Sequence, residues 1–198
     1  MTRQFHSPMT PGDGFFDQLL GGTDPALVQE AGDRAAAVLV RGARESDDPE
    51  VAERILHLAE EEGIETIAEV WSGAPADTLA GCLWRLYLLR SWVYADPTTV
   101  AREYDAGRIR AQVARVVAGV ADPPGPDELK TMVDEVLRGI ARGEFADVLL
   151  RAAAFARVVA AGRAILDPDA TGPDARHMLQ LSEQLEAAGH AELQHRLG

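Results

Sequence analysis

The sequence is poor in cysteine, and Cys82 is its only one. One thiol excludes an intramolecular disulfide and any metal site built from several cysteines. Because Cys82 lies within an apolar run, we expect it to behave as a small hydrophobic side chain. Long uninterrupted apolar runs are absent too. The opening residues lack the apolar core of a signal peptide, and no later run is long enough to span a bilayer. We therefore expect a cytoplasmic protein with no membrane partner.

Positive charge is also scarce. The 198 residues include 19 lysines and arginines against 32 acidic residues, which gives a net charge of -13. Such a field repels nucleic-acid phosphates, so we expect no direct nucleic-acid partner. The charge is unevenly spread. Residues 45–69 hold ten acidic residues and one arginine, whereas residues 85–115 hold six arginines and three acidic residues. These segments can complement each other within a monomer or across a dimer interface.

Short catalytic and phosphate-binding motifs are missing. The sequence contains no G-x-S-x-G nucleophile motif, no G-x-x-x-x-G-K-[ST] phosphate loop and no G-x-G-x-x-G dinucleotide motif. We therefore predict no catalytic residue and no cofactor, and we favour a protein that is not an enzyme.

Two groups of residues have the spacing of metal ligands on a helix. Glu53, His57 and Glu61 lie four residues apart, and Glu192 with His195 forms an E-x-x-H pattern. Helical di-iron sites use that pattern in pairs, and the chain contains only one copy. The acidic residues around Glu53 are also typical of a solvated helix surface. We therefore predict no metal site.

The apolar residues recur at helical spacing, and no segment alternates as a strand would. We predict an all-α protein, a single-domain bundle of seven to nine helices around a buried central helix at about 78–94. Breaks rich in proline, glycine and aspartate divide the chain further. We expect a disordered tail at 1–14, a helical core at 15–166, a linker at 167–174 and a C-terminal helix at 175–198 packed on the core.

The aromatic residues are concentrated in one place. All three tryptophans and two of the three tyrosines fall within residues 71–94. Over residues 79–94 the only polar interruptions are Arg85, Arg90 and Ser91. A helix that is apolar on every face is typical of one surrounded by neighbours. This segment is therefore the predicted centre of the fold, and its two arginines are the charges that need partners.

Two interpretations of these arginines differ in function. In the first, they pair with the acidic helices that precede them, with Glu65 and Glu69 as the named partners, and the aromatics fill the core. In the second, guanidinium groups fixed by aromatic stacking form a pocket for an anionic or planar ligand. The ligand-binding residues would then be Trp84, Arg85, Tyr87, Arg90, Trp92 and Tyr94.

The stretch EVWSGAPADTLAGCLWRLYLLRSWVYADP, from Glu69 to Pro97, resembles an uncharacterised family of helical proteins from actinobacteria. It covers about a seventh of the chain. The matching residues are of core type, so the resemblance implies a helical fold and assigns no activity.

The function predicted from these patterns is a protein–protein interaction or regulatory module. Self-association as a homodimer is the first candidate, because the small residues of the 145–166 helix let another helix approach closely. Burial of that helix inside its own monomer explains the same residues. The alternative function is a small-ligand-binding protein or enzyme with an arginine–aromatic pocket around Arg85 and Arg90.

Overall fold

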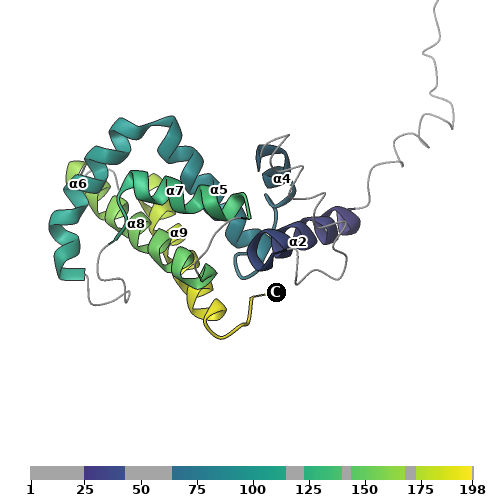
Figure 1. Cartoon of the computed structure of the whole chain (residues 1–198). Helices are drawn as coiled ribbons and strands as arrows, with labels where there is room; N and C mark the ends of the chain where they lie inside the picture. Colours follow the sequence, from purple (N-terminus) through teal and green to yellow (C-terminus); the bar gives the residue numbers. More distant parts are fainter. Residues whose placement is uncertain (1–24, 43–63, 115–122, 140–143, 168–172, 198) are drawn as a thin grey trace, which may run out of the picture.

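A computed structural model describes residues 25–42, 64–114, 123–139, 144–167 and 173–197. These residues form seven α-helices and no strand, which confirms the all-α class. Figure 1 shows α2 and α4 at one end of the molecule and α6 at the other. The helices are α2 (Pro25–Arg41), α4 (Ile64–Val70), α5 (Leu79–Ala95), α6 (Pro97–Ala114), α7 (Pro126–Leu137), α8 (Phe145–Leu166) and α9 (Pro173–Glu192).

Helix α5 is the predicted central helix, and it contacts all six of the other described helices. Its start is set by Thr78, whose hydroxyl oxygen accepts a 3.0 Å hydrogen bond from the backbone N–H of Gly81. This contact satisfies one of the free N–H groups of the first turn. The helix ends before Asp96, and Pro97 begins α6. The carboxylate of Asp96 then accepts a 3.1 Å hydrogen bond from the N–H of Thr99. One aspartate therefore separates the two helices and caps the second.

Helix α8 is buried over most of its length by other helices of the same chain, and its last residues are exposed. Thirteen of its 22 residues are buried, and α6 and α9 pack along its length. At the crossing with α6, Gly107 and Gly162 face each other so closely that a Cβ on either would overlap the backbone opposite. The small residues of α8 therefore admit helices of the same monomer. Burial of these small residues within the monomer, the second explanation offered above, is the arrangement observed, and self-association stays a prediction.

Helix α9 differs from its predicted bounds at both ends, since it begins at Pro173 and ends at Glu192. Residues 193–197 turn away from the helix, and His195 adopts a positive φ of 51°. Gly189 has a packing role: a Cβ there would lie 2.8 Å from Cγ of Leu150 on α8. Close approach to α8 explains this glycine within the helix.

Helices α2 and α4 are joined to the bundle through a buried tryptophan. Trp71, which follows α4, is fully buried, and its indole N–H donates a 2.9 Å hydrogen bond to the carbonyl of Gly32 on α2. At the other end of α2, Arg41 pairs with the buried carboxylate of Glu192, and the Nη2–Oε2 contact is 2.9 Å. The beginning and the end of the described chain are therefore held together.

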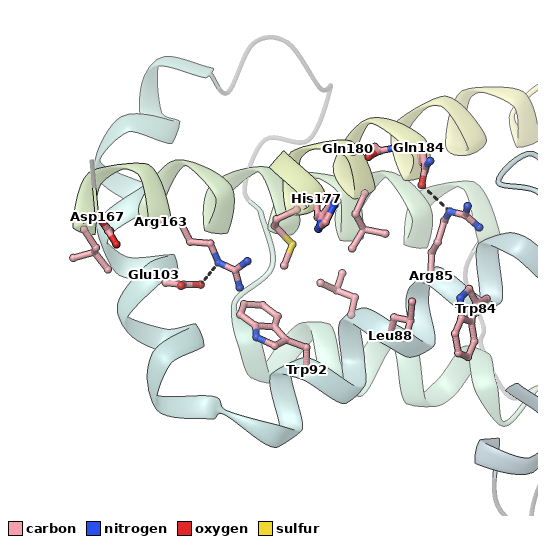
Figure 2. A pocket seen from close by; sticks show the side chains of 14 residues that line it. Trp84, Arg85, Leu88, Trp92, Glu103, Arg163, Asp167, His177, Gln180 and Gln184 are labelled. Atoms are coloured by element: carbon pink, nitrogen blue, oxygen red, sulfur yellow. Dashed lines mark hydrogen bonds and ion pairs between the residues drawn. The ribbon is translucent and has the colours of Figure 1, made fainter. Parts of the chain in front are cut away.

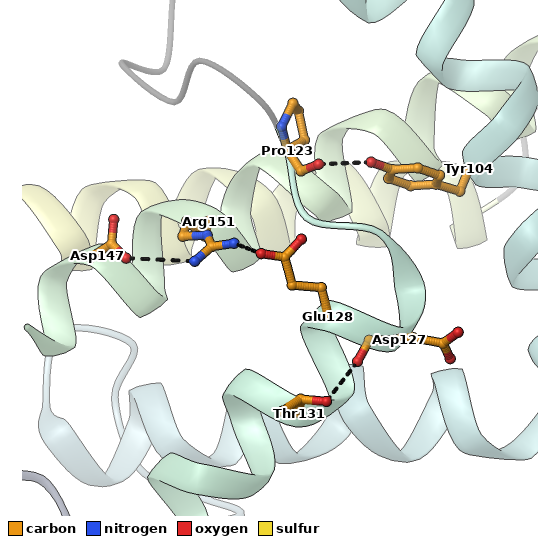
Figure 3. Close-up of polar contacts among 7 residues, drawn as sticks. All are labelled: Tyr104, Pro123, Asp127, Glu128, Thr131, Asp147 and Arg151. Atoms are coloured by element: carbon orange, nitrogen blue, oxygen red, sulfur yellow. Dashed lines mark hydrogen bonds and ion pairs between the residues drawn. The ribbon is translucent and has the colours of Figure 1, made fainter. Parts of the chain in front are cut away.

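Polar contacts fix the segment that leads into α7 (Figure 3). The Tyr104 hydroxyl of α6 donates a 2.8 Å hydrogen bond to the carbonyl of Pro123. Arg151 of α8 pairs with Glu128 in the first turn of α7 and lies 4.0 Å from Asp147. An acidic residue in a first helical turn also complements the helix dipole. Three helices are thus connected around the start of α7.

Several predictions lie outside the described residues. These are the disordered tail at 1–14, most of the 167–174 linker, and the helix with Glu53, His57 and Glu61. Within the described ranges, none of the helices combines the length and the apolar character that crossing a membrane requires.

Candidate functional site

A pocket of about 800 Å³ opens between α5 and α9. Figure 2 shows α5 along one side and α9 along the other, with α6 and α8 closing one end. Residues of all four helices line it: Trp84, Arg85, Leu88, Leu89, Trp92, Glu103, Arg163, Leu166, Asp167, His177, Met178, Gln180, Leu181 and Gln184. The volume falls in the range of pockets that hold small molecules in proteins.

The middle of the pocket is apolar. Trp84, Leu88 and Trp92 are four residues apart on α5, a spacing that places side chains one above another on a helix face. Trp84 and Trp92 are partly buried, while Leu88 is 43% exposed. Met178 and Leu181 lie opposite them on α9. Exposure of a large apolar side chain inside a hollow indicates a surface that a ligand can cover.

One end of the pocket holds a positive charge that no carboxylate neutralises among the residues described. The Nε–H of Arg85 donates to Oε1 of Gln184 at 2.8 Å, and its Nη1 donates to the carbonyls of Gly81 at 2.8 Å and Ala74 at 3.5 Å. Within that same set of residues, its Nη2 has no hydrogen-bond partner. These contacts hold the guanidinium in place, and none of the three acceptors carries a negative charge.

The opposite end carries a compensated arginine. Nε of Arg163 lies 2.8 Å from a carboxylate oxygen of Glu103, and both side chains are mostly buried. The guanidinium carbon of Arg163 also lies 4.7 Å from the centre of the Trp92 ring, within the range of a cation–π contact. Asp167 and the exposed His177 complete this end.

Arg90 and Tyr94 belong to a different face of α5. Arg90 pairs with Asp134 of α7, and the same carboxylate accepts a 2.8 Å hydrogen bond from the Tyr94 hydroxyl. This hydrogen bond, the largest cause, raises the pKa of Tyr94 above its ordinary value. The Tyr94 ring lies between two cations, with Arg90 at 4.7 Å and Lys130 at 5.1 Å. Neither Arg90 nor Tyr94 lines the pocket.

The partners predicted for the two arginines were wrong. Glu65 and Glu69 are exposed on α4 and pair with neither arginine. The reason is geometric, because Arg85 faces α9 and Arg90 faces α7. Each arginine meets a polar side chain of a helix packed against α5, although acidic side chains lie closer in sequence.

Three of the six residues predicted for ligand binding therefore line the pocket: Trp84, Arg85 and Trp92. Tyr87 supports it from behind, since its ring stacks on Trp84 at 5.6 Å between ring centres. Sequence reasoning missed Leu88, although its position midway between Trp84 and Trp92 was visible as a four-residue spacing. It also missed the residues from α6, α8 and α9, for which no local signal exists.

The thiol and the remaining acidic groups offer little chemistry. Burial, the largest cause, raises the pKa of the Cys82 thiol to about 12, and its sulfur lies 3.5 Å from the carbonyl of Ala76. A thiol that stays protonated at neutral pH is a poor nucleophile. Among the described residues, no three histidine, cysteine or acidic side chains are grouped as metal ligands. Glu192, one of the predicted candidates, is instead bound by Arg41.

The geometry can thus hold an elongated molecule with an apolar body and a polar group in an open hollow between α5 and α9. The resemblance of residues 69–97 to an actinobacterial family stays a prediction. Comparisons of the chain with protein-family models, with curated proteins and with solved structures found no match.

Proposed function

We propose that this protein binds a small amphipathic molecule in the pocket between α5 and α9. The observation that carries the proposal is the contrast within one pocket, which has tryptophan and leucine walls in its middle and arginines at its two ends. Binding pockets for small molecules commonly combine an apolar lining with a few fixed polar groups. Here the fixed groups are Arg85, held by three acceptors, and Arg163, held by Glu103.

The length of the pocket limits the size of the ligand. Trp84 and Trp92 are eight positions apart, which is a rise of roughly 12 Å along a helix. A single extended hydrocarbon chain or a short fused ring system fits that length. Covering Leu88 removes an apolar side chain from water, a contribution of roughly 1.5–3 kcal/mol for full burial.

Octanol is a suitable test ligand, because it is neutral and its apolar chain can reach along the pocket. At ten times its dissociation constant, a ligand adds roughly 1.4 kcal/mol of stability. For a protein of this size that raises the unfolding midpoint by roughly 3–6 °C. We expect octanol to produce this shift, measured by circular dichroism.

Two variants test whether octanol binds in this pocket. Leu88→Glu replaces an apolar wall of the pocket with a hydrated charge, and we expect it to weaken octanol binding by about tenfold. Leu179→Glu is the matched control, since Leu179 lies on α9, is 42% exposed and does not line the pocket. Equal binding by both variants, or no octanol-induced shift in the natural protein, contradicts the proposed function.

Protein–protein interaction is a second candidate, and Tyr94 is the observation that favours it. Tyr94 is 49% exposed, and two cations and the Asp134 carboxylate hold its side chain in place. Rigid tyrosines beside arginines are enriched among the residues that dominate protein interfaces. A second copy of the chain is the partner to test first. Sedimentation velocity of the natural protein should show a concentration-dependent dimer that Tyr94→Ala weakens. If the natural protein is a monomer at all concentrations, self-association through Tyr94 is wrong.

A further inference from the structure

We propose that the ligand is an amphipathic monocarboxylate whose carboxylate binds at the Arg85 end of the pocket. This inference rests on the proposed function and adds the charge of the ligand and its direction. The carboxylate would receive hydrogen bonds from Arg85 and Gln184. Its apolar body would lie along Leu88 and reach toward Trp92.

The donors at this end are arranged by the protein itself. Because Nε of Arg85 donates to Gln184, the amide of Gln184 must present Oε1 to the arginine and keep its NH₂ group elsewhere. Among the described residues, neither that NH₂ group nor Nη2 of Arg85 has a partner. Two side chains that line the pocket therefore keep unused donors. A carboxylate has two acceptor oxygens and can use both.

The number of free donors favours a single negative charge. Nε and Nη1 of Arg85 are already occupied by protein acceptors, so the side chain cannot present its two-nitrogen fork to a ligand. Phosphate is best bound where such forks or several cations converge. The net charge of -13 also opposes a dianion more than a monoanion. A monocarboxylate is the anion that these donors and this charge accommodate.

The direction of the ligand follows from the difference between the two ends. Arg163 is paired with Glu103 at 2.8 Å. A ligand carboxylate placed there would compete with Glu103 for the same guanidinium and would be repelled by its like charge. At the other end, Arg85 has no carboxylate partner among the residues described. The anionic group is therefore directed to Arg85, and the apolar tail points toward Trp92.

The experiment compares octanoate, octanol and octyl phosphate, which share one alkyl chain, by calorimetric titration of the full chain. We expect octanoate to bind roughly 10- to 100-fold more tightly than octanol, the range of one or two charge-assisted hydrogen bonds. Arg85→Met should remove this preference, so that octanoate and octanol bind the variant with equal affinity. Any octanol binding that remains shows that the variant is folded and that its apolar wall is intact. Arg163→Met is the control at the other end and should keep the preference for octanoate.

The outcomes separate the two proposals. If none of the three ligands binds, the proposed function fails, and the inference fails with it. If octanoate and octanol bind equally, the pocket binds amphiphiles but the charge assignment is wrong. If octyl phosphate binds more tightly than octanoate, the monocarboxylate class is wrong. If Arg163→Met, and not Arg85→Met, removes the preference, the ligand lies in the opposite direction.

Discussion

The crossing of α6 and α8 gives the sharpest test of the packing that supports the pocket. Gly162→Ala would place a Cβ 1.7 Å from the carbonyl oxygen of Glu103, and ordinary contacts begin at 3.4 Å. The obstacle is backbone, so a side-chain rotation cannot relieve it. The two helices must therefore separate by about 1.7 Å. The substitution would also move Glu103 and Arg163, which form one end of the pocket.

The magnitude follows from two opposing effects. Overpacking of this kind costs roughly 1–3 kcal/mol or more, and a backbone obstacle favours the upper end. Replacing glycine by alanine within a helix contributes about 1 kcal/mol in the other direction. We expect a net loss of about 2 kcal/mol, which lowers the unfolding midpoint by roughly 4–8 °C in a protein of this size.

Thermal unfolding followed by circular dichroism measures this effect. Gly73→Ala is the control, because a Cβ at Gly73 would meet no atom within 4 Å. We expect its stability to lie within about 0.5 kcal/mol of the natural protein. If Gly162→Ala is as stable as Gly73→Ala, the close crossing of α6 and α8 is wrong.

Further predictions concern the cap of α5, the Arg90–Asp134 ion pair and the buried thiol of Cys82. Thr78→Ala should lower stability by about 1 kcal/mol through loss of the α5 cap, and an unchanged urea midpoint would count against that cap. A double-mutant cycle on Arg90 and Asp134 should give a coupling free energy on the order of 1–2 kcal/mol. A coupling free energy of zero would contradict the ion pair between them. Cys82 should resist iodoacetamide until the protein unfolds. Burial raises the pKa of the Cys82 thiol to about 12 in the folded state, whereas in the unfolded chain the thiol has its ordinary pKa of 9.0. The folded state is therefore not weakened by ionisation of this thiol below pH 9.0. As the pH rises from 9.0 toward 12, ionisation of the thiol in the unfolded chain lowers the free energy of unfolding. Cys82→Ala should remove this decrease.

Local chemistry explains what could be predicted from the sequence. The bounds of α5 depend on Thr78 at one end and on Asp96 with Pro97 at the other, and each acts on residues within a few positions. The apolar pattern that predicted a helix surrounded by neighbours is confirmed by its contacts with every other described helix. The bounds of α8 were equally visible, because its apolar run is bordered by residues that break helices.

The partners of charged residues could not be predicted, because they depend on how the helices pack. Arg85 meets Gln184 across 99 positions of sequence, and Arg90 meets Asp134 across 44. Sequence proximity pointed instead to Glu65 and Glu69. For the same reason, the sequence predicted only one of the two walls of the pocket. Its α5 wall lies in one aromatic segment, whereas its α9 wall is built from residues with ordinary helical surface patterns.

The small residues of α8 illustrate a further limit. Their size indicates that another helix approaches closely, but it carries no information about which chain supplies that helix. Gly162 and Gly107 answer the question here, since each accommodates the backbone of the other's helix within one monomer.

The most direct measurement of ligand binding uses the indole N–H signals of the three tryptophans in a ¹H–¹⁵N spectrum. Trp84 and Trp92 line the pocket, whereas Trp71 is fully buried and its indole is bound to the carbonyl of Gly32. Titration with octanoate should shift the Trp84 and Trp92 signals together and leave the Trp71 signal in place. If Trp84 and Trp92 do not respond, or if Trp71 moves as much as they do, the ligand does not occupy the pocket between α5 and α9.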